Sequence, residues 1–165
     1  MMDAILNRRS TRAFTEEAVP EEKIRQLLNA GFHANSAHHL RPWHFIVVDN
    51  TAILRELYLA HPNMAVLKTA PAALIVCGDS ERSPDFWPDD CAAATENILI
   101  AAQSTGLGSF WCAIYPRIQR MESVCRLFGL PESVKPYSVV AIGTPVEPKP
   151  PVERYSEKCV HRNIW

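Results

Sequence analysis

The sequence lacks any long apolar run: no uninterrupted apolar stretch approaches the roughly 20 residues needed to cross a bilayer. The first 14 residues carry too much charge for a secretory signal peptide. No internal repeat or low-complexity tract divides the chain. We therefore expect a soluble, cytoplasmic protein without a membrane partner, whose 165 residues form a single domain, residues 1–165.

Cysteine is present without any recognisable pairing pattern. The five cysteines, at positions 77, 91, 112, 125 and 159, are odd in number and widely spaced, and no two form a Cys-x-x-Cys pair. Neither a disulfide framework nor a thiolate zinc site is therefore expected. The cysteines are interpreted as reduced thiols.

An excess of either charge is also missing. The 17 Lys and Arg residues nearly balance the 18 Asp and Glu residues, which leaves a net charge of −1. The whole molecule therefore has no field that would attract nucleic acid, and no nucleic-acid partner is expected. Within the basic set, however, 12 residues are Arg and 5 are Lys, and Arg is the residue suited to forked binding of phosphate or carboxylate.

Helical and strand patterns alternate along the chain, which predicts a mixed α and β domain with about four strands. Residues 92–102 are apolar at eight of eleven positions around the full circumference, so they should form a helix buried in the middle of the fold. Asp89 or Asp90 can cap the start of that helix, and Gly106 can end it. The expected elements, in chain order, are helices at 3–9 and 20–32, a strand at 45–48, a helix at 51–59, a strand at 72–77, the helix at 92–102, a strand at 110–114, a helix at 118–128 and a strand at 137–143.

The last 21 residues, 145–165, follow a different pattern. Four prolines in the first seven of these positions forbid a helix there and favour an extended path. Yet the segment carries Tyr155, Val160, Ile164 and Trp165, apolar side chains that need a surface to lie on. Either this arm folds back over its own domain or it reaches another subunit, and its extended character favours exchange between two copies.

The first candidate site is a basic segment near the N-terminus, Arg8-Arg9-Ser10-Thr11-Arg12. Three guanidiniums and two hydroxyls within five residues suit a phosphate monoester, because one Arg side chain can bind two of its oxygens at once. A solvated basic turn is the alternative interpretation. An RNA-binding patch is disfavoured, because no flanking basic or aromatic residues extend the segment.

The second candidate site is the loop at residues 34–43, Ala-Asn-Ser-Ala-His-His-Leu-Arg-Pro-Trp. Small and polar residues that lead into a Pro-Trp pair can lie against a flat ring, although Trp43 itself is expected in the core. The neighbouring His38 and His39 point in opposite directions in an extended chain, and no carboxylate or thiol stands at ligand spacing. No metal site is therefore expected.

The third candidate site is the turn that joins the buried helix to the next strand. Gly106 and Gly108 would let the backbone approach another group closely. The turn is not a dinucleotide-binding fingerprint, because a third glycine is missing and the order is helix to strand. A helix C-cap followed by a tight turn is the alternative interpretation.

Together, in order and over nearly the whole chain, these motifs resemble the FMN-dependent nitroreductase family. The motifs are basic-x-Ser-x-Arg, a small and polar loop into Pro-Trp-x-Phe, Asn-x-x-x-Ala-Ala-x-x-x-Gly-Leu-Gly-x-x-Trp, and a late Arg before an aromatic tail. The resemblance implies an α+β fold with a mostly antiparallel central sheet flanked by helices. It also implies a homodimer that exchanges its C-terminal arms, residues 145–165, each arm adding a strand to the partner's sheet.

The resemblance further implies which residues bind FMN. Arg8, Arg9 and Ser10 would hold the phosphate, which Arg154 would close off. Arg12 and Asn63 would lie at the pyrimidine edge of the isoalloxazine ring. The remaining contacts would come from Asn35, Ser36, Ala37 and His39 of the other copy, which border the ring, and from Ile114, Tyr115 and Pro116, which line it near N5 and O4.

Two positions depart from the family's pattern. The family's loop commonly has Asn and Gln where this chain has His39 and Arg41. Arg41 either stabilises the anionic N1 of reduced flavin or faces solvent, so the acceptor range stays open. The chain is short for the family, and residues 85–88, Asp-Phe-Trp-Pro, form either a small lid or a packed surface loop.

The implied function is hydride transfer from NADH or NADPH, through flavin N5, to a nitroaromatic, a quinone or a similar electron-poor small molecule. One pocket used in turn by donor and acceptor implies ping-pong kinetics. No catalytic side chain is expected, because the cofactor performs the redox chemistry. Two alternatives are another flavin reaction (reductive dehalogenation, ene reduction or flavin fragmentation) and a flavin-binding module without turnover.

Overall fold

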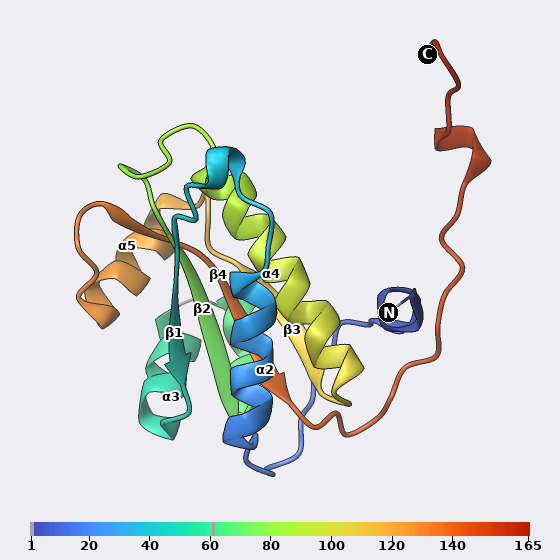
Figure 1. Ribbon diagram of the computed structural model, residues 1–165. Helices are drawn as coiled ribbons and strands as arrows, with labels where there is room; N and C mark the ends of the chain where they lie inside the picture. The colour runs from blue at the N-terminus through green and yellow to red at the C-terminus, as the bar shows by residue number, and fades with distance from the viewer. Residues whose placement is uncertain (1, 61) are drawn as a thin grey trace.

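A four-stranded antiparallel sheet organises the chain, in a computed structural model that describes residues 2–60 and 62–165 (Figure 1). Its strand order is β1-β2-β4-β3, and every strand pairing is antiparallel. The expected α+β class and antiparallel sheet are therefore confirmed. The strands are β1 (Trp43–Val48), β2 (Ala72–Asp79), β3 (Gly108–Ala113) and β4 (Val134–Gly143).

Helices cover both faces of this sheet, with α2 and α4 on one face and α3 and α5 on the other (Figure 1). Among residues 2–60 and 62–165, none of these helices is both long and apolar enough to cross a membrane. The helices are α1 (Met2–Asn7), α2 (Glu21–Phe32), α3 (Thr51–Ala60), α4 (Trp87–Ser104) and α5 (Ile118–Phe128), with 3₁₀ turns η1 (Ala37–His39), η2 (Pro62–Lys68) and η3 (Glu157–Cys159).

The central strands are apolar without interruption because helices cover both sides of them. In β2, Ile75 and Cys77 belong to the core beneath α3 and α5. Leu74 and Val76 belong to the core beneath α2 and α4. The sheet therefore separates two hydrophobic cores, and the side chains of β2 alternate between them.

Helix α4 lies in the middle of the fold, as its apolar circumference predicts, but it is longer than expected. It begins at Trp87, Phe86 is its N-cap residue without a side-chain hydrogen bond, and Pro88 stands in its first turn. Proline suits the start of a helix because the first N–H groups have no helical partner. The interpretation of Asp89 or Asp90 as the cap is therefore wrong: both residues lie inside the first turn.

The C-terminal arm leaves the body of the molecule after β4. Its first residues run beside residues 13–15, where the Val146 N–H donates to the carbonyl of Ala13 and Phe14 bridges to Pro145. Lys149 and Pro150 still contact residues 9 and 10, and beyond them the arm extends away from the sheet (Figure 1), where Tyr155 and Trp165 are 72% and 98% exposed. The apolar side chains at the end of the arm therefore do not lie on their own domain, which was one of the two expectations.

Candidate functional site

The basic segment after α1 runs along the outer edge of β3. Ser10 forms a parallel bridge with Ser109, and the Thr11 N–H donates to the carbonyl oxygen of Ser109 at 2.9 Å. Gly108 makes this close approach possible, because a Cβ atom there would lie 2.5 Å from Thr11 Oγ1. The Gly-Leu-Gly turn thus packs against the chain's own basic segment.

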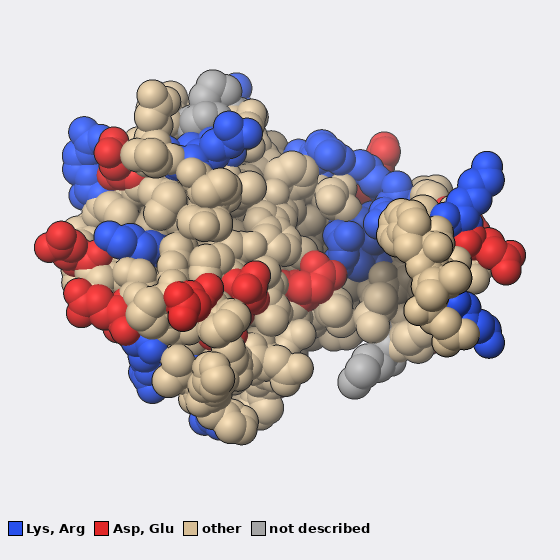
Figure 2. Space-filling view, turned by 90° about the horizontal axis from the view of Figure 1, so that it is seen from above, with Lys and Arg blue, Asp and Glu red and all other residues tan. Residues whose placement is uncertain are grey.

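Three cationic side chains make contacts around this segment, which is half-buried at residues 8–10. Arg8 Nε lies 3.6 Å from Glu96 Oε1 of α4, and Arg9 Nη1 donates to the carbonyl oxygen of Pro150 at 2.7 Å. Lys149 Nζ donates to the carbonyl oxygen of Ser10 at 3.4 Å. Figure 2 shows Lys and Arg side chains gathered between the body of the molecule and the arm.

This donor set can bind a phosphate group. Among residues 2–60 and 62–165, Glu96 is the one carboxylate that forms an ion pair with Arg8, Arg9 or Lys149. The guanidinium of Arg12 lies 5.1 Å from the centre of the Phe110 ring. Arg and Lys side chains in such an arrangement bind phosphate oxygens through charge-assisted hydrogen bonds. Lys149 was not among the residues expected here, since nothing local in the sequence relates it to Ser10.

The loop at residues 35–41 is fixed by a buried carboxylate on α4. Asp90, which is 4% exposed, accepts the Ala37 N–H on Oδ1 at 2.8 Å and the Ser36 hydroxyl on Oδ2 at 3.1 Å. Ser36 Oγ in turn accepts the N–H of Arg41 at 2.7 Å. The sequence placed Asp90 at the helix start but did not indicate this contact across the fold.

The same loop has an unusual backbone. His38, His39 and Arg41 all have positive φ angles, of 52°, 57° and 49°. Non-glycine residues rarely adopt this left-handed conformation, which persists only where the surroundings hold it. The hydrogen bonds to Asp90 and a contact between the rings of His38 and Phe86, with centroids 5.9 Å apart, supply that support.

A hollow of about 950 Å³ opens beside this loop and the start of β1. Asn35, Ser36, His39 and Arg41 line it from the loop, and Arg82 lines it from the turn before α4. Trp43 also borders it but is only 5% exposed, which confirms that this side chain belongs to the core. Among residues 2–60 and 62–165, no group of three or more His, Cys, Asp and Glu side chains could hold a metal ion.

Residues 114–116 follow β3 and support an aromatic cluster. Ile114 is fully buried, whereas the ring of Tyr115 is stacked on Tyr137, with centroids 5.9 Å apart. The N–H groups of Ile114 and Tyr115 both donate to the Tyr137 carbonyl oxygen, at 3.1 and 3.0 Å. Burial raises the pKa of the Tyr137 phenol, which therefore stays neutral near pH 7.

Residues 85–88, which were expected to form either a small lid or a packed surface loop, pack against neighbouring side chains. Trp87 is 7% exposed, begins α4 and contacts the edge of the Tyr115 ring, with centroids 4.9 Å apart. Phe86 is more exposed and packs against His38. The segment therefore belongs to the support of the loop and of the aromatic cluster.

The single chain brings only part of the expected site together. Arg8, Arg9 and Ser10 form one cluster, in which Arg8 pairs with Glu96 of α4. The loop at 35–39 binds a different position of α4, the carboxylate of Asp90. These two positions are about 9 Å apart along the helix axis. Asn63 lies exposed in η2, and Arg154 lies exposed in the arm, where its N–H donates to Glu153 Oε1.

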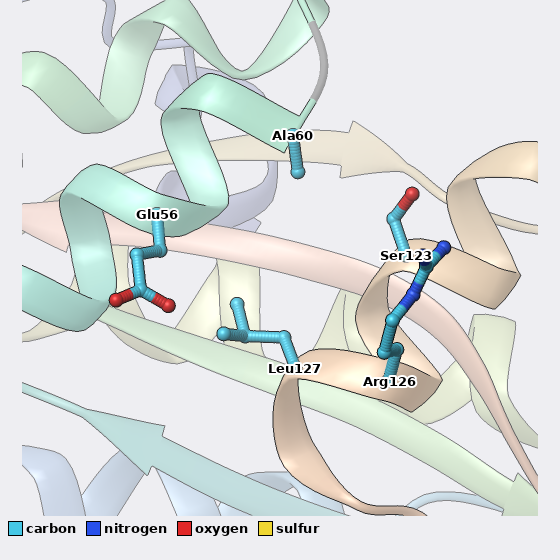
Figure 3. A pocket seen from close by; sticks show the side chains of 5 residues that line it. All are labelled: Glu56, Ala60, Ser123, Arg126 and Leu127. Atoms are coloured by element: carbon cyan, nitrogen blue, oxygen red, sulfur yellow. The ribbon is translucent and has the colours of Figure 1, made fainter.

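A further hollow, of about 480 Å³, lies between α3 and α5 on the other face of the sheet. In Figure 3, Glu56 and Ala60 come from α3, and Ser123, Arg126 and Leu127 come from α5. None of the expected site residues lines it. The hollow between α3 and α5 is therefore separate from the basic segment and from the loop at 35–41.

Comparison with known proteins identifies the family to which the chain belongs. A model of the nitroreductase family matches residues 5–76 and 58–144. A protein of Methanothermobacter thermautotrophicus named "Putative NADH dehydrogenase/NAD(P)H nitroreductase" is 43% identical over 167 residues, which cover 100% of this chain and 87% of that protein.

Solved structures agree with this match. The FMN-dependent nitroreductase of Clostridium difficile R20291 superposes with a TM-score of 0.95 at 29% identity and covers 100% of both chains. The NADPH:FMN oxidoreductase of Vibrio harveyi, complexed with NAD+, superposes with a TM-score of 0.85 at 26% identity, covering 99% of this chain and 77% of that one. With most of its length matched by the family model and by a relative of 43% identity, this chain belongs to the nitroreductase family of oxidoreductases.

Proposed function

We propose that the protein is an FMN-dependent oxidoreductase. It would transfer a hydride from NADH or NADPH to nitroaromatic, quinone or similar electron-poor acceptors. The observation that carries this proposal is the cationic cluster formed by the half-buried residues 8–10 and the exposed Lys149, inside a fold shared with an FMN-dependent nitroreductase. When bound, FMN supplies the redox chemistry, accepting the hydride at N5 and passing it on.

The cationic cluster would hold the FMN phosphate. Arg8 and Arg9 can each present two N–H donors to the phosphate, and the Ser10 hydroxyl can add a further donor. Arg154 would complete the phosphate site. Arg12 and Asn63 would lie at the pyrimidine edge, where a positive charge from Arg12 favours the reduced, anionic flavin.

The ring would be bordered by two segments. Ile114, Tyr115 and Pro116 would line it near N5 and O4, and a neutral Tyr137 beneath Tyr115 adds no charge there. The second segment, with Asn35, Ser36, Ala37 and His39, would come from the partner subunit. We assign no nucleophile or general acid among these residues, because the chemistry proposed needs neither.

A homodimer would complete this site, and two features support it. The outer edge of β1 has no strand partner among residues 2–60 and 62–165. Open edges of this kind accept strands from other chains. The arm of a second copy, with its exposed Tyr155 and Trp165, has the extended form and the apolar side chains that such pairing needs.

The proposal is tested by the absorption spectrum of the purified protein and its response to NADH and NADPH without oxygen. We expect bound FMN, rapid bleaching by one nicotinamide, and parallel lines in double-reciprocal plots against a quinone, as ping-pong kinetics require. A colourless protein that does not take up FMN would overturn the proposal. Bleaching that needs a separate reductase would instead favour another flavin reaction.

The phosphate assignment has its own test. Arg8→Ala should weaken FMN binding about ten- to a hundredfold, because a hydrogen bond to a charged group contributes roughly 1.5–3 kcal/mol. Arg25→Ala, on the exposed side of α2, is the matched control and should leave FMN affinity unchanged. Equal FMN affinity in the two variants would show that Arg8 does not hold the phosphate.

A further inference from the structure

Two arginines, Arg41 and Arg82, line the hollow beside the loop at 35–41. With three histidines, His33, His39 and His44, they account for half of its lining. Among the residues that the structure describes, no Asp or Glu side chain lines this hollow. A concave surface of this composition raises the local concentration of anions.

Within the part of the chain that the structure describes, the two guanidiniums in this hollow have no charged partner. Among residues 2–60 and 62–165, no Asp or Glu oxygen lies within 4.0 Å of either Arg41 or Arg82. The two carboxylates bonded to the segments that line the hollow accept other donors. Asp90 accepts from Ser36 and Ala37, and Asp79 accepts the backbone N–H groups of Glu81 and Arg82. The positive charge of the arginines therefore remains available to a ligand.

Both arginines stand on backbone that is held in place. The N–H of Arg41 donates to Ser36 Oγ at 2.7 Å, and Ser36 is itself bound to Asp90. The N–H of Arg82 donates to Asp79 Oδ1 at 3.1 Å. These hydrogen bonds fix the backbone at Arg41 and Arg82. A fixed backbone lowers the conformational entropy that the two arginines lose when they bind an anion.

Besides Asn35 and Ser36, the rest of the hollow is an apolar and aromatic wall. Phe32 is 56% exposed, and its ring packs edge-on against Phe45, with centroids 4.9 Å apart. Trp43 and Ala34 continue this wall. A flat apolar ring fits against such a wall, and a carboxylate or sulfonate on that ring fits a pair of guanidiniums.

We propose that this hollow binds the anionic group of the electron acceptor, so that aromatic carboxylates and sulfonates are preferred over their neutral counterparts. The inference rests on the proposed function for the identity of this ligand as an acceptor. It assigns to Arg41 the role of contacting the acceptor rather than flavin N1, and it adds Arg82, which the sequence did not single out.

Direct binding tests the hollow without turnover. Calorimetry on the FMN-loaded protein should show that 2-naphthoate binds at least tenfold more tightly than 2-naphthamide, which has the same ring without the charge. Arg41→Gln and Arg82→Gln should each weaken 2-naphthoate binding about tenfold and change 2-naphthamide binding less than twofold. Arg55→Gln, at an exposed position of α3, is the control and should change neither. Equal affinity of the wild-type protein for the two probes would overturn the inference.

Steady-state kinetics then distinguish the acceptor from the donor. The ratio of kcat/KM for 4-nitrobenzoate over 4-nitrobenzamide should fall about tenfold in Arg41→Gln and in Arg82→Gln, while the KM for the nicotinamide stays constant. A raised KM for NADPH with an unchanged ratio would show that the arginines bind the donor's phosphates instead. If neither nicotinamide bleaches the flavin, the proposed function fails, whereas the calorimetry still reports on the hollow.

Discussion

Asp90 offers the sharpest prediction, because one buried carboxylate holds a loop that is remote in sequence. Its two oxygens accept the Ala37 N–H at 2.8 Å and the Ser36 hydroxyl at 3.1 Å. Each hydrogen bond to a charged group is worth about 1.5–3 kcal/mol, and part of this is recovered when the opened loop binds water. Asp90→Ala should therefore lower the free energy of opening the loop by about 2–4 kcal/mol.

Hydrogen exchange followed residue by residue measures this opening. A loss of about 2–4 kcal/mol predicts that the Ala37 and Arg41 amides exchange roughly thirty- to several-hundredfold faster. Asp90→Asn should fall between the wild-type protein and Asp90→Ala, since its amide oxygen can still accept the Ala37 N–H. The amides of β2 and β4 should change much less, because they open only with the whole fold.

Asp89→Ala is the matched control for this experiment. Asp89 lies on the same first turn of α4 but is exposed, so its removal changes the charge at the helix start without touching the loop. Equal exchange rates at Ala37 in the two alanine variants would refute the role given to Asp90. Acceleration spread evenly over the sheet would refute it too, since that result indicates global destabilisation.

Three further predictions concern other parts of the chain. Gly108→Ala would place a Cβ atom 2.5 Å from Thr11 Oγ1. Urea denaturation should therefore show that the free energy of unfolding falls by about 1–3 kcal/mol, and FMN binding should weaken. An unchanged free energy of unfolding would contradict the close packing of β3 against the basic segment. Burial raises the pKa of the Cys112 thiol from 9.0 to about 12, so the folded protein keeps a proton that the unfolded chain releases, and stability should fall as pH rises from 9 towards 12. Cys112→Ala should reduce that decline by about 1.4 kcal/mol in total between pH 8 and pH 10, in denaturation curves at pH 8, 9 and 10. Removing residues 149–165 should give a weaker dimer that loses FMN on gel filtration, and a flavin-loaded monomer would refute the exchanged arm.

Much of the fold could be predicted because its signals are local. Helix α5 begins and ends at the expected residues, since its apolar period is followed directly by Gly129, which has the left-handed φ of 60° that ends helices. The strands were placed correctly but too short. Strand β1 starts at Trp43 because that residue pairs with Gly78. Pairing between segments so far apart cannot be inferred from the local sequence of either segment.

The candidate site likewise contains residues that local sequence predicts and residues that only the folded chain brings together. Arg8, Arg9 and Ser10 are neighbours in sequence, so their common role could be inferred from composition alone. Lys149 reaches Ser10 across 139 positions, and Asp90 reaches Ser36 across 54. Asp90 was interpreted as a helix cap because the cap is a short-range rule, whereas its true partners are known only once the chain is folded.

The geometry of α4 supports the proposal that two copies of the chain build the flavin site. Asp90 carries the loop at 35–41 and Glu96 faces Arg8, and six residues of helix separate these positions by about 9 Å along the axis and about 120° around it. The two halves of the site therefore diverge from a single rigid helix. In a symmetric dimer, the loop of one copy can instead meet the arginines of the other. Under the proposed function, FMN then binds only where the copies associate, so flavin affinity and dimer stability rise and fall together.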